Sequence, residues 1–448
     1  MGKIVAKFGG SSLADAKQFR QVKHIISLDD RRCYVVPSAP GKRFSGDDKV
    51  TDLLYAAHRF VNEGGTGENV ALTKIRERYN SIRTELGLHT DIDRELDAIE
   101  AKLSSGISRD EIASRGEYLN GLLLAEYLGY AFLDPKDFIF FNEKGIFQGE
   151  KTNDCLSAIL QKMPNAVVPG FYGSLPDGSI HTFSRGGSDI TGAIVARAAN
   201  EELYENWTDV DGFLMADPRV VKDPQLIEHI TYRELRELSY MGATVLHEDS
   251  VFPVHAAGIP TNIRNTGRPE APGTMISFGF PGEKQKYTIT GVAGHVGFSV
   301  LSVEKDMMNA EVGFGRKVLQ AVEECGLSFE HLPTGIDTMC VVILTKALGP
   351  VKDQLIRRIV ELVEPDVITV NDNIGIIATV GRGMVHNPGT AARLFSALSR
   401  AHVNVEMIDQ GSSELSILVG IRSTDYDRAV NAIYDEFVRS EQPREDNP

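Results

Sequence analysis

Lysine and glycine meet at the end of an apolar run near the N-terminus. In the segment IVAKFGGSS, Lys7 is closely followed by Gly9, Gly10 and Ser11. Glycine amides can approach a phosphate closely, a helix N-terminus attracts anions, and the lysine adds a full positive charge. The segment is not a Walker A loop, because its lysine precedes the glycines. It predicts a phosphate contact of another kind, with a plain glycine turn as the alternative.

A second glycine turn opens a helical pattern in FSRGGSDITGAIVARAA, residues 183–199. Arginine suits bidentate capture of a carboxylate, and hydroxyl and glycine amide groups suit phosphate oxygens. The alternative is a simple helix N-cap made by the serine or the aspartate. The residues concerned are Arg185, Gly186, Gly187, Ser188 and Asp189.

A third segment, ENWTDVDGFLMADPRVV, reads as a strand that ends in polar residues and is followed by a loop. Ligands of open α/β folds bind at the carboxyl edge of the sheet, where such residues would lie. A tight turn built on DxDG is the alternative. The candidate residues are Thr208, Asp209, Asp211 and Arg219.

A fourth candidate is Glu117 in ASRGEYLNGLLLAEYL, which we expect early in an amphipathic helix. A glutamate in that position most often compensates the helix dipole. Glu117 therefore depends on the other three segments for a functional interpretation.

Alternating strands and helices must position these residues. Apolar runs at 4–8, 33–39 and 166–171 alternate with helical patterns, the first of which begins near Ala14. This alternation predicts an α/β fold, a mainly parallel sheet with helices on both faces. We expect one such domain over residues 1–280.

An internal repeat follows the Gly- and Pro-rich stretch at 265–287, which we take as a domain boundary. At an offset of 76, Gly313 matches Gly389 and Glu330 matches Glu406. Each copy reads helix, strand, turn, strand, which predicts two βαββαβ units. The apolar helix positions Val318, Leu319 and Val322 match Leu394, Phe395 and Leu398. The predicted domains are 287–365 and 372–441, with a polar tail at 442–448.

Taken in order, these segments resemble the aspartate kinases of the amino acid kinase superfamily. The resemblance covers nearly the whole chain and rests on KFGGSS, PSAP, SRGE, SRGGSD, WTDVDG with ADPR, SYMGATVLH, IRNTGRPEAPGT and the C-terminal repeat. It implies transfer of the γ-phosphoryl group of ATP to the side chain of L-aspartate, giving 4-phospho-L-aspartate for lysine, threonine and methionine biosynthesis. It also implies Mg²⁺, although no metal ligands can be assigned from the sequence.

The resemblance assigns a role to each candidate residue. Lys7 would contact the transferred phosphate, and Asp189 would orient that lysine. Arg185 would clamp the α-carboxylate of aspartate, and Glu117 would meet its ammonium group. The other assignments are Gly9, Gly10, Ser11, Gly186, Gly187 and Ser188 to phosphate, Ser38 and Thr51 to aspartate, and Thr208, Asp209, Asp211 and Arg219 to the nucleotide.

Two departures from the family pattern and one loop leave questions open. Ser11 stands where the family often has threonine, and Thr244 where many members carry a lysine near the nucleotide. Residues 41–50 form either a mobile lid or a solvated loop. Two alternatives for the function are another amino acid kinase, and an amino-acid-binding regulator with an inactive kinase domain.

The repeat resembles the paired ACT domains of aspartate kinases, which bind amino acids and pair edge to edge. This implies a homodimer or a tetramer. We expect lysine as the feedback inhibitor, because Asp337 could pair with its ammonium group, with threonine as the alternative. By family position the effector would touch Met308, Gly313, Phe314, Gly315, Thr334 and Asp337.

Composition excludes several classes of function. A formal net charge of -15 argues against nucleic-acid binding, which needs clustered basic residues. No stretch is long and apolar enough to span a bilayer, and the N-terminus lacks the pattern of a signal peptide. The cysteines form no CxxC pair, so we expect a reducing, cytoplasmic location with neither a zinc site nor a disulfide framework. They are Cys33, Cys155, Cys325 and Cys340.

Overall fold

The structure is a computed structural model that describes residues 2–184, 186–200, 202–242, 252–280, 282 and 285–441. The chain forms two compact units. The first comprises Met1–Phe213, Glu228–Tyr232 and Val245–Pro281. The second comprises Leu214–Ile227, Arg233–Thr244 and Gly282–Pro448. No helix among the described residues is long and apolar enough to cross a membrane.

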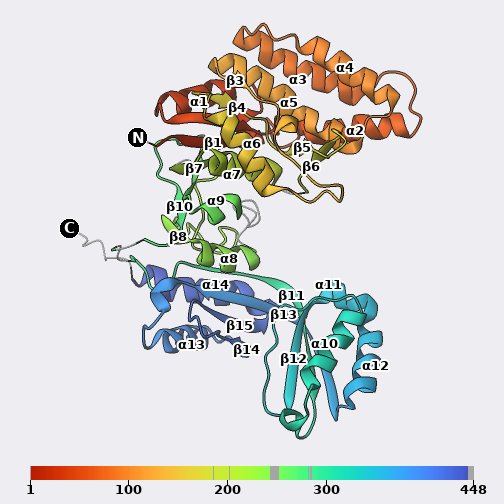
Figure 1. The fold of residues 1–448 in the computed structure, drawn as a ribbon. Coiled ribbons are helices and arrows are strands. Elements are labelled where there is room, and N and C mark those ends of the chain that lie inside the picture. The colour runs from red at the N-terminus through yellow and green to blue at the C-terminus, as the bar shows by residue number, and fades with distance from the viewer. Residues whose placement is uncertain are drawn as a thin grey trace, which may run out of the picture. The chain divides into compact units, whose positions relative to one another are not determined.

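An eight-stranded sheet forms the centre of the first unit, in the order β3-β4-β2-β1-β7-β9-β10-β8 (Figure 1). Neighbouring strands run parallel, except that β10 is antiparallel to β9. The predicted mainly parallel sheet is therefore confirmed. The strands are β1 (Ile4–Phe8), β2 (Arg32–Pro37), β3 (Ala131–Phe132), β4 (Ala166–Val167), β7 (Leu203–Thr208), β8 (His229–Thr231), β9 (Thr261–Asn265) and β10 (Thr274–Ser277), with a separate hairpin of β5 (Tyr172–Ser174) and β6 (Ile180–Thr182).

Helices cover both faces of this sheet. On one face, five helices share a core with Phe8 and Trp207; on the other, α7 packs on β1, β2 and β7 and contacts α6 and α9. Lys7 and Asn206 alternate with Phe8 and Trp207 along their strands, so they point toward α7. The helices are α1 (Ala16–Ser27), α2 (Val50–Asn62), α3 (Val70–Leu86), α4 (Ile92–Ser105), α5 (Arg109–Leu128), α6 (Gly149–Leu160), α7 (Gly187–Ala199) and α9 (Phe252–Ala257).

Helix α5 begins earlier than the sequence led us to expect. The Ser108 side chain caps it by accepting the Glu111 N–H, so Glu117 lies in the middle of the helix and not in its first turn. Position 116 inside the helix is a glycine, and any larger residue would bring a Cβ within 2.8 Å of the Ala39 Cβ. The dipole interpretation of Glu117 is therefore wrong, and the glycine brings α5 close to the segment after β2.

The second unit contains a five-stranded antiparallel sheet in the order β12-β11-β13-β15-β14. The long strands β11 and β13 pair along nearly their whole length, so one sheet extends through both copies of the repeat. The strands are β11 (Gly291–Glu304), β12 (Thr338–Leu344), β13 (Val367–Val380), β14 (Val405–Asp409) and β15 (Ser416–Arg422). The helices are α8 (Tyr232–Tyr240), α10 (Phe314–Glu324), α11 (Thr345–Leu348), α12 (Lys352–Val363), α13 (Thr390–Arg400) and α14 (Tyr426–Tyr434).

The repeat is visible in equivalent helices. Helices α10 and α13 both have 11 residues and follow Gly313 and Gly389, whose φ angles of 85° and 93° are left-handed. The two copies differ in the next strand: β14 pairs with β15 as a strand with one register shift, whereas the first copy forms only isolated bridges at His331 and Thr334. Pro333 lies between them and has no N–H for a strand ladder, so this predicted strand is wrong.

Candidate active site

The carboxyl ends of neighbouring parallel strands bring predicted site residues to one edge of the first sheet. Strand β1 leads into Gly9, β2 into Ser38 and β7 into Asp209, and β9 ends at Asn265. Backbone hydrogen bonds join these exits, because Ser38 N–H donates to the Phe8 carbonyl at 3.0 Å. Open parallel sheets bind ligands at this edge.

Lys7, Asp189 and Asn206 form a buried polar cluster at this edge. The Lys7 Nζ lies 2.5 Å from Asp189 Oδ1 and donates to Asn206 Oδ1 at 3.3 Å. Asn206 Nδ2 in turn donates to Asp189 Oδ1 at 2.8 Å. The lysine side chain is only 9% exposed, so its ammonium position is set by two side chains from β7 and α7. The structure thus brings Lys7 and Asp189 together as the resemblance implied.

Sequence reasoning missed Asn206. It pairs in register with Lys7 on the adjacent strand, and it is 4% exposed. The available signal was a polar amide inside a largely buried strand, between Glu205 and Trp207. Buried polar side chains require partners, so such a residue points to a polar cluster.

The two glycines of the first turn differ in the space that a side chain would have. An added Cβ on Gly10 would lie 2.8 Å from the Ala39 carbonyl oxygen, whereas on Gly9 the nearest atom would be 3.5 Å away. The Gly9 N–H donates to the Trp207 carbonyl at 2.9 Å. Our assignment of the Gly9 amide to phosphate is therefore corrected: that amide fastens the turn to β7. The amides of Gly10 and Ser11 begin a 3₁₀ helix, where N–H groups have no partner within the helix.

The second glycine turn begins helix α7. Gly186 has a left-handed φ of 57°, and a Cβ on Gly187 would collide with the Phe171 ring. Ser188 is buried against Gly170, and Asp189 lies in the first turn of the helix. The helix N-terminus therefore faces the Lys7 cluster. Arg185 lies outside the described residues.

Glu117 and Asn120 present two buried acceptor oxygens one helical turn apart on α5. Glu117 Oε2 and Asn120 Oδ1 have no hydrogen-bond partner among the described residues. Burial raises the pKa of the Glu117 carboxyl to about 8, although a hydrogen bond from the Ala39 backbone opposes this shift. Asn120 Nδ2 donates to the Ser38 carbonyl at 2.6 Å, which connects α5 to the exit of β2. Sequence reasoning missed Asn120, and Thr51 lies half-buried in the first turn of α2.

The nucleotide candidates after β7 are divided between the two units. Thr208 Oγ1 donates to Asp209 at 3.2 Å, and Asp211 accepts from Asn265 Nδ2 at 2.8 Å and pairs with Arg268. Asn265 is opposite Thr208 in the sheet register. These two partners, which sequence reasoning missed, stand in the IRNTGRPEAPGT phrase.

Arg219 belongs to the second unit. Its side chain is 86% exposed and forms an ion pair of 2.6 Å with Asp217. The described geometry therefore does not join Arg219 to the other three nucleotide candidates. Thr244, the departure noted in the sequence, lies outside the described residues.

Some of the predicted effector residues of the second unit are buried in its core, and others are exposed on its surface. Met308 and Phe314 are buried in one hydrophobic cluster, and Gly313 and Gly315 flank Phe314 at the start of α10. Thr334 and Asp337 are exposed. Asp337 accepts the Met307 N–H at 3.0 Å, which connects its loop to the segment before α10.

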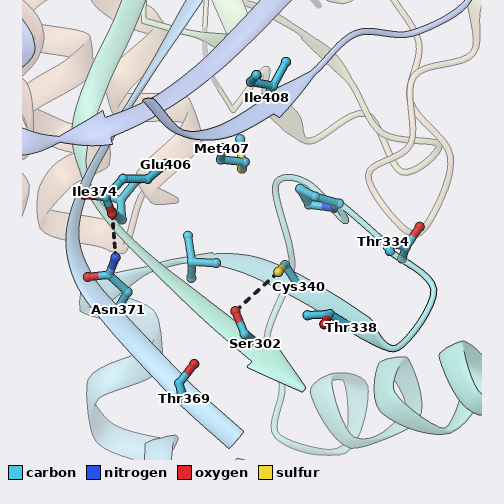
Figure 2. A pocket seen from close by; sticks show the side chains of 13 residues that line it. Ser302, Thr334, Thr338, Cys340, Thr369, Asn371, Ile374, Glu406, Met407 and Ile408 are labelled. Atoms are coloured by element: carbon cyan, nitrogen blue, oxygen red, sulfur yellow. Dashed lines mark hydrogen bonds between the residues drawn. The ribbon is translucent and has the colours of Figure 1, made fainter. Parts of the chain in front are cut away.

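A cavity of about 480 Å³ lies in the second unit, between strands from both copies of the repeat (Figure 2). Thr334 is on its rim, and Ser302 and Cys340 make a contact of 3.3 Å on its wall. Glu406, from β14, provides its carboxylate and accepts from Asn371 at 2.7 Å. Of the predicted effector residues, this cavity includes Thr334.

No group of three or more His, Cys, Asp and Glu residues within the described ranges could hold a metal ion. Two acidic residues at the sheet edge form ion pairs, Asp189 with Lys7 and Asp211 with Arg268. The described residues therefore do not fit a Mg²⁺ site made by the protein alone. This agrees with the preference of Mg²⁺ for nucleotide phosphates and water.

Comparison with known proteins identifies the family. The amino acid kinase family profile matches residues 2–265, and an ACT domain profile matches residues 377–437. Aspartokinase 3 of Bacillus subtilis is 40% identical, over 97% of this chain and 98% of that protein. The crystal structure of Clostridium acetobutylicum aspartate kinase is 46% identical and superimposes with a TM-score of 0.89, covering 98% of this chain and all of that chain.

Escherichia coli aspartokinase III has the same fold at lower identity. Its complex with aspartate and ADP has a TM-score of 0.71, and its complex with lysine and aspartate one of 0.72. Each is 23% identical and covers 97% of this chain and 99% of that chain. The alternatives of another amino acid kinase and of an inactive regulator are wrong, because the relatives that match over the full length are aspartate kinases. The chain therefore belongs to the amino acid kinase family, as an aspartate kinase, an ATP-dependent phosphotransferase, with a C-terminal ACT region.

Proposed function

We propose that phosphoryl transfer to aspartate takes place at the carboxyl edge of the first sheet, with Lys7 as the cation that meets the transferred group. The buried cluster of Lys7, Asp189 and Asn206 carries this proposal. Because two side chains hold the ammonium group, its position is set before substrates bind. Such preorganised charge stabilises the charge that develops on the phosphoryl oxygens.

The chemistry requires electrostatic help and no general base. The side-chain carboxylate of aspartate has an unperturbed pKa near 4, so it is an ionised nucleophile at neutral pH. Two anions must nevertheless meet in line. We assign the amides of Gly10 and Ser11 and the turn at Gly186, Gly187 and Ser188 to the phosphate oxygens, since both open helices.

Aspartate is proposed to bind beside α5. Its ammonium group would meet Glu117 Oε2 and Asn120 Oδ1, two buried acceptor oxygens that lack a partner among the described residues. Ser38 and Thr51 would add hydrogen bonds, and Arg185 would clamp the α-carboxylate. The aspartate in the Escherichia coli complexes supports a site of this kind.

ATP is proposed to lie at the end of β7, against Thr208, Asp209 and Asp211. The ADP bound to Escherichia coli aspartokinase III supports this assignment. Mg²⁺ would arrive with the phosphates of the nucleotide and neutralise part of their charge. The residues above bind and orient the substrates.

Replacement of Lys7 tests the proposed site. Lys7→Ala should lower kcat by at least 100-fold and change KM for aspartate much less, because the ammonium group acts on the transferred phosphoryl group. Hydroxylamine trapping of the acyl phosphate measures this directly. Turnover at the unaltered rate would remove Lys7 from the mechanism.

We further propose that the second unit senses lysine. The sequence ranges 1–280, 287–365 and 372–441 would then be the kinase domain and two ACT domains. Support comes from the repeat of α10 and α13 and from the lysine complex of Escherichia coli aspartokinase III. The lysine would bind near Thr334 and Asp337, whose exposed carboxylate suits an ammonium group.

Calorimetry tests the effector. Lysine should bind with saturating heat and inhibit hydroxamate formation, and Asp337→Asn should weaken binding by about tenfold or more, as expected for a charge-assisted hydrogen bond. Threonine is the control ligand. Saturation by threonine with no heat from lysine would reverse the assignment.

A homodimer or tetramer is also proposed. Strand β12 lies at an edge of the second sheet, and its neighbouring turns expose Met307, Val312 and Ile336 at 70%, 96% and 70%. Exposed apolar side chains gathered beside a sheet edge favour contact with a second copy.

A further inference from the structure

A buried arginine on α3 holds two loops of the first unit. Arg78 is 4% exposed, and its Nη1 donates to the Gly41 carbonyl at 3.0 Å and to the Ala14 carbonyl at 3.3 Å. Its Nη2 donates to Asp47 Oδ2 at 2.7 Å and to the Asp48 carbonyl at 3.4 Å. Its acceptors therefore lie in the segment after the first glycine turn and in the loop that follows β2.

These two segments meet backbone to backbone. The Gly41 N–H donates to the Gly10 carbonyl at 2.8 Å, and an added Cβ on Gly41 would lie 2.6 Å from the Gly10 carbonyl carbon. Such an approach leaves little freedom to either glycine. The orientation of the Gly10–Ser11 peptide, and with it the Ser11 N–H, thus depends on where Gly41 is held.

The rest of the loop is anchored at a single buried side chain. Residues 42–46 are exposed, whereas Asp47 is 9% exposed and accepts from Arg43 Nε at 2.8 Å as well as from Arg78. The Arg43 hydrogen bond holds the pKa of Asp47 well below its usual range. Asp47 therefore stays ionised at neutral pH.

We propose that Arg78 is a positioning residue of the kinase reaction, which holds Gly41 and Ala14 so that the Ser11 amide keeps its orientation toward the transferred phosphate. This inference rests on the phosphate role proposed for the Ser11 amide. Arg78 acts mainly through the backbone, because three of its four hydrogen bonds go to main-chain carbonyls and the fourth goes to the Asp47 side chain. It should therefore affect the ATP side of the reaction more than the aspartate side.

Steady-state kinetics with each substrate test this role in the full-length enzyme. Arg78→Gln should lower kcat/KM for ATP by roughly 100-fold, the effect of a small misplacement of a catalytic group, with KM for aspartate nearly unchanged. Arg78→Lys keeps the charge and one donor direction, so it should recover part of the loss. Equal effects on both substrates, or no recovery with lysine, would overturn the inference.

Arg76→Gln is the matched control. Arg76 lies on the same helix but pairs with Asp93 and Asp97 on α4, at 3.0 and 2.7 Å. Its replacement tests the general effect of removing an arginine ion pair from α3, and it should leave both kcat/KM values near those of the native enzyme. A loss for ATP equal to that of Arg78→Gln would show a structural effect of the helix.

A second variant keeps the inference testable if Arg78→Gln does not fold. Asp47→Asn weakens the ion pairs and leaves the carbonyl contacts of Arg78 in place. Trypsin should then cleave faster after Lys42 and Arg43, and kcat/KM for ATP should fall by less than in Arg78→Gln. Native cleavage and native kinetics together would contradict the inference.

The Lys7→Ala variant, measured in the same assay, distinguishes failure of the proposed catalytic site from failure of the positioning role of Arg78. If Lys7→Ala keeps native turnover, the proposed site itself fails. If Lys7→Ala loses turnover while Arg78→Gln keeps native kcat/KM for ATP, only the positioning role of Arg78 fails.

Discussion

Burial raises the pKa of the Glu117 carboxyl to about 8, so most of the free enzyme holds it protonated at neutral pH. An aspartate ammonium group pairs well only with the ionised form. KM for aspartate should therefore fall as pH rises from 6 to 8, by up to about tenfold per pH unit, and level off above the pKa. Initial rates across this pH range provide the measurement.

Calorimetry in buffers of different ionisation enthalpy provides a second readout of Glu117. Aspartate binding at pH 7 should release close to one proton, because the ammonium group stabilises the ionised carboxylate. Glu117→Gln is the control and should show a flat pH profile and no release. Binding heats that are independent of the buffer in the native enzyme would contradict the shifted pKa.

The same shift has a consequence for stability. The folded protein binds this proton more tightly than the unfolded chain, in which the pKa is near 4.5. The free energy of unfolding therefore loses the contribution of Glu117 as pH rises from about 4.5 to about 8. The ionised Glu117 carboxylate therefore makes the free enzyme less stable. This agrees with a residue that binds a ligand, because the bound ammonium group would compensate for the cost.

At the scale of elements, the first glycine turn contains one glycine required by packing and one that tolerates a side chain. Gly10→Ala should lower kcat by at least 100-fold, because the new Cβ would lie 2.8 Å from the Ala39 carbonyl oxygen and displace the turn. Gly9→Ala is the matched control, since its Cβ would have 3.5 Å of space. Kinetics and thermal unfolding of both variants provide the check, and equal losses of activity would contradict the packing argument.

Elements also show where local patterns failed. Helix α5 starts at its Ser108 cap, well before Glu117, and continues through Gly116, where a Cβ would lie 2.8 Å from the Ala39 Cβ. A glycine lowers helix propensity in isolation, and tertiary contact reverses that preference. The irregular strand before Pro333 shows the converse, since a missing N–H prevents regular pairing whatever the apolar pattern.

At the scale of the molecule, α8 lies within the residues that match the amino acid kinase family profile, and residues 233–240 of this helix belong to the second unit. Glu234 on this helix is fully buried and accepts from the Thr290 hydroxyl at 2.6 Å and from Arg382 N–H and Nη1 at 2.8 and 2.9 Å. Residues 290 and 382 belong to the strand and turn region of the ACT sheet. The chain thus passes between the two units before the ACT repeat begins.

Replacement of Glu234 should therefore affect regulation more than catalysis. Glu234→Ala should lower the free energy of unfolding by about 3–5 kcal/mol, because it leaves buried donors without their acceptor. It should also weaken inhibition by lysine, with kcat in the absence of lysine less affected. Denaturant unfolding and inhibition curves test both effects. Glu237→Gln, a half-buried position on the same helix, is the control, and equal loss of inhibition there would contradict the prediction.

The sequence by itself determined the family, the parallel sheet, the two glycine turns and the repeat. These four features depend on residues that are close together in the sequence. The periods of strands and helices are local properties of the chain, and so are glycine turns and helix starts. Lys7 and Asp189 could be named from such turns alone, before their contact was visible.

Only the tertiary structure decided which groups share one site. Asn206 was missed because its partner Lys7 is 199 residues away in the chain, and the Gly9 amide was misassigned because its acceptor, the Trp207 carbonyl, lies on another strand. The raised pKa of Glu117 and the contacts of Arg78 likewise arise from burial among distant segments. Burial, hydrogen-bond partners and charge depend on distances through space, which the order of residues along the chain does not specify.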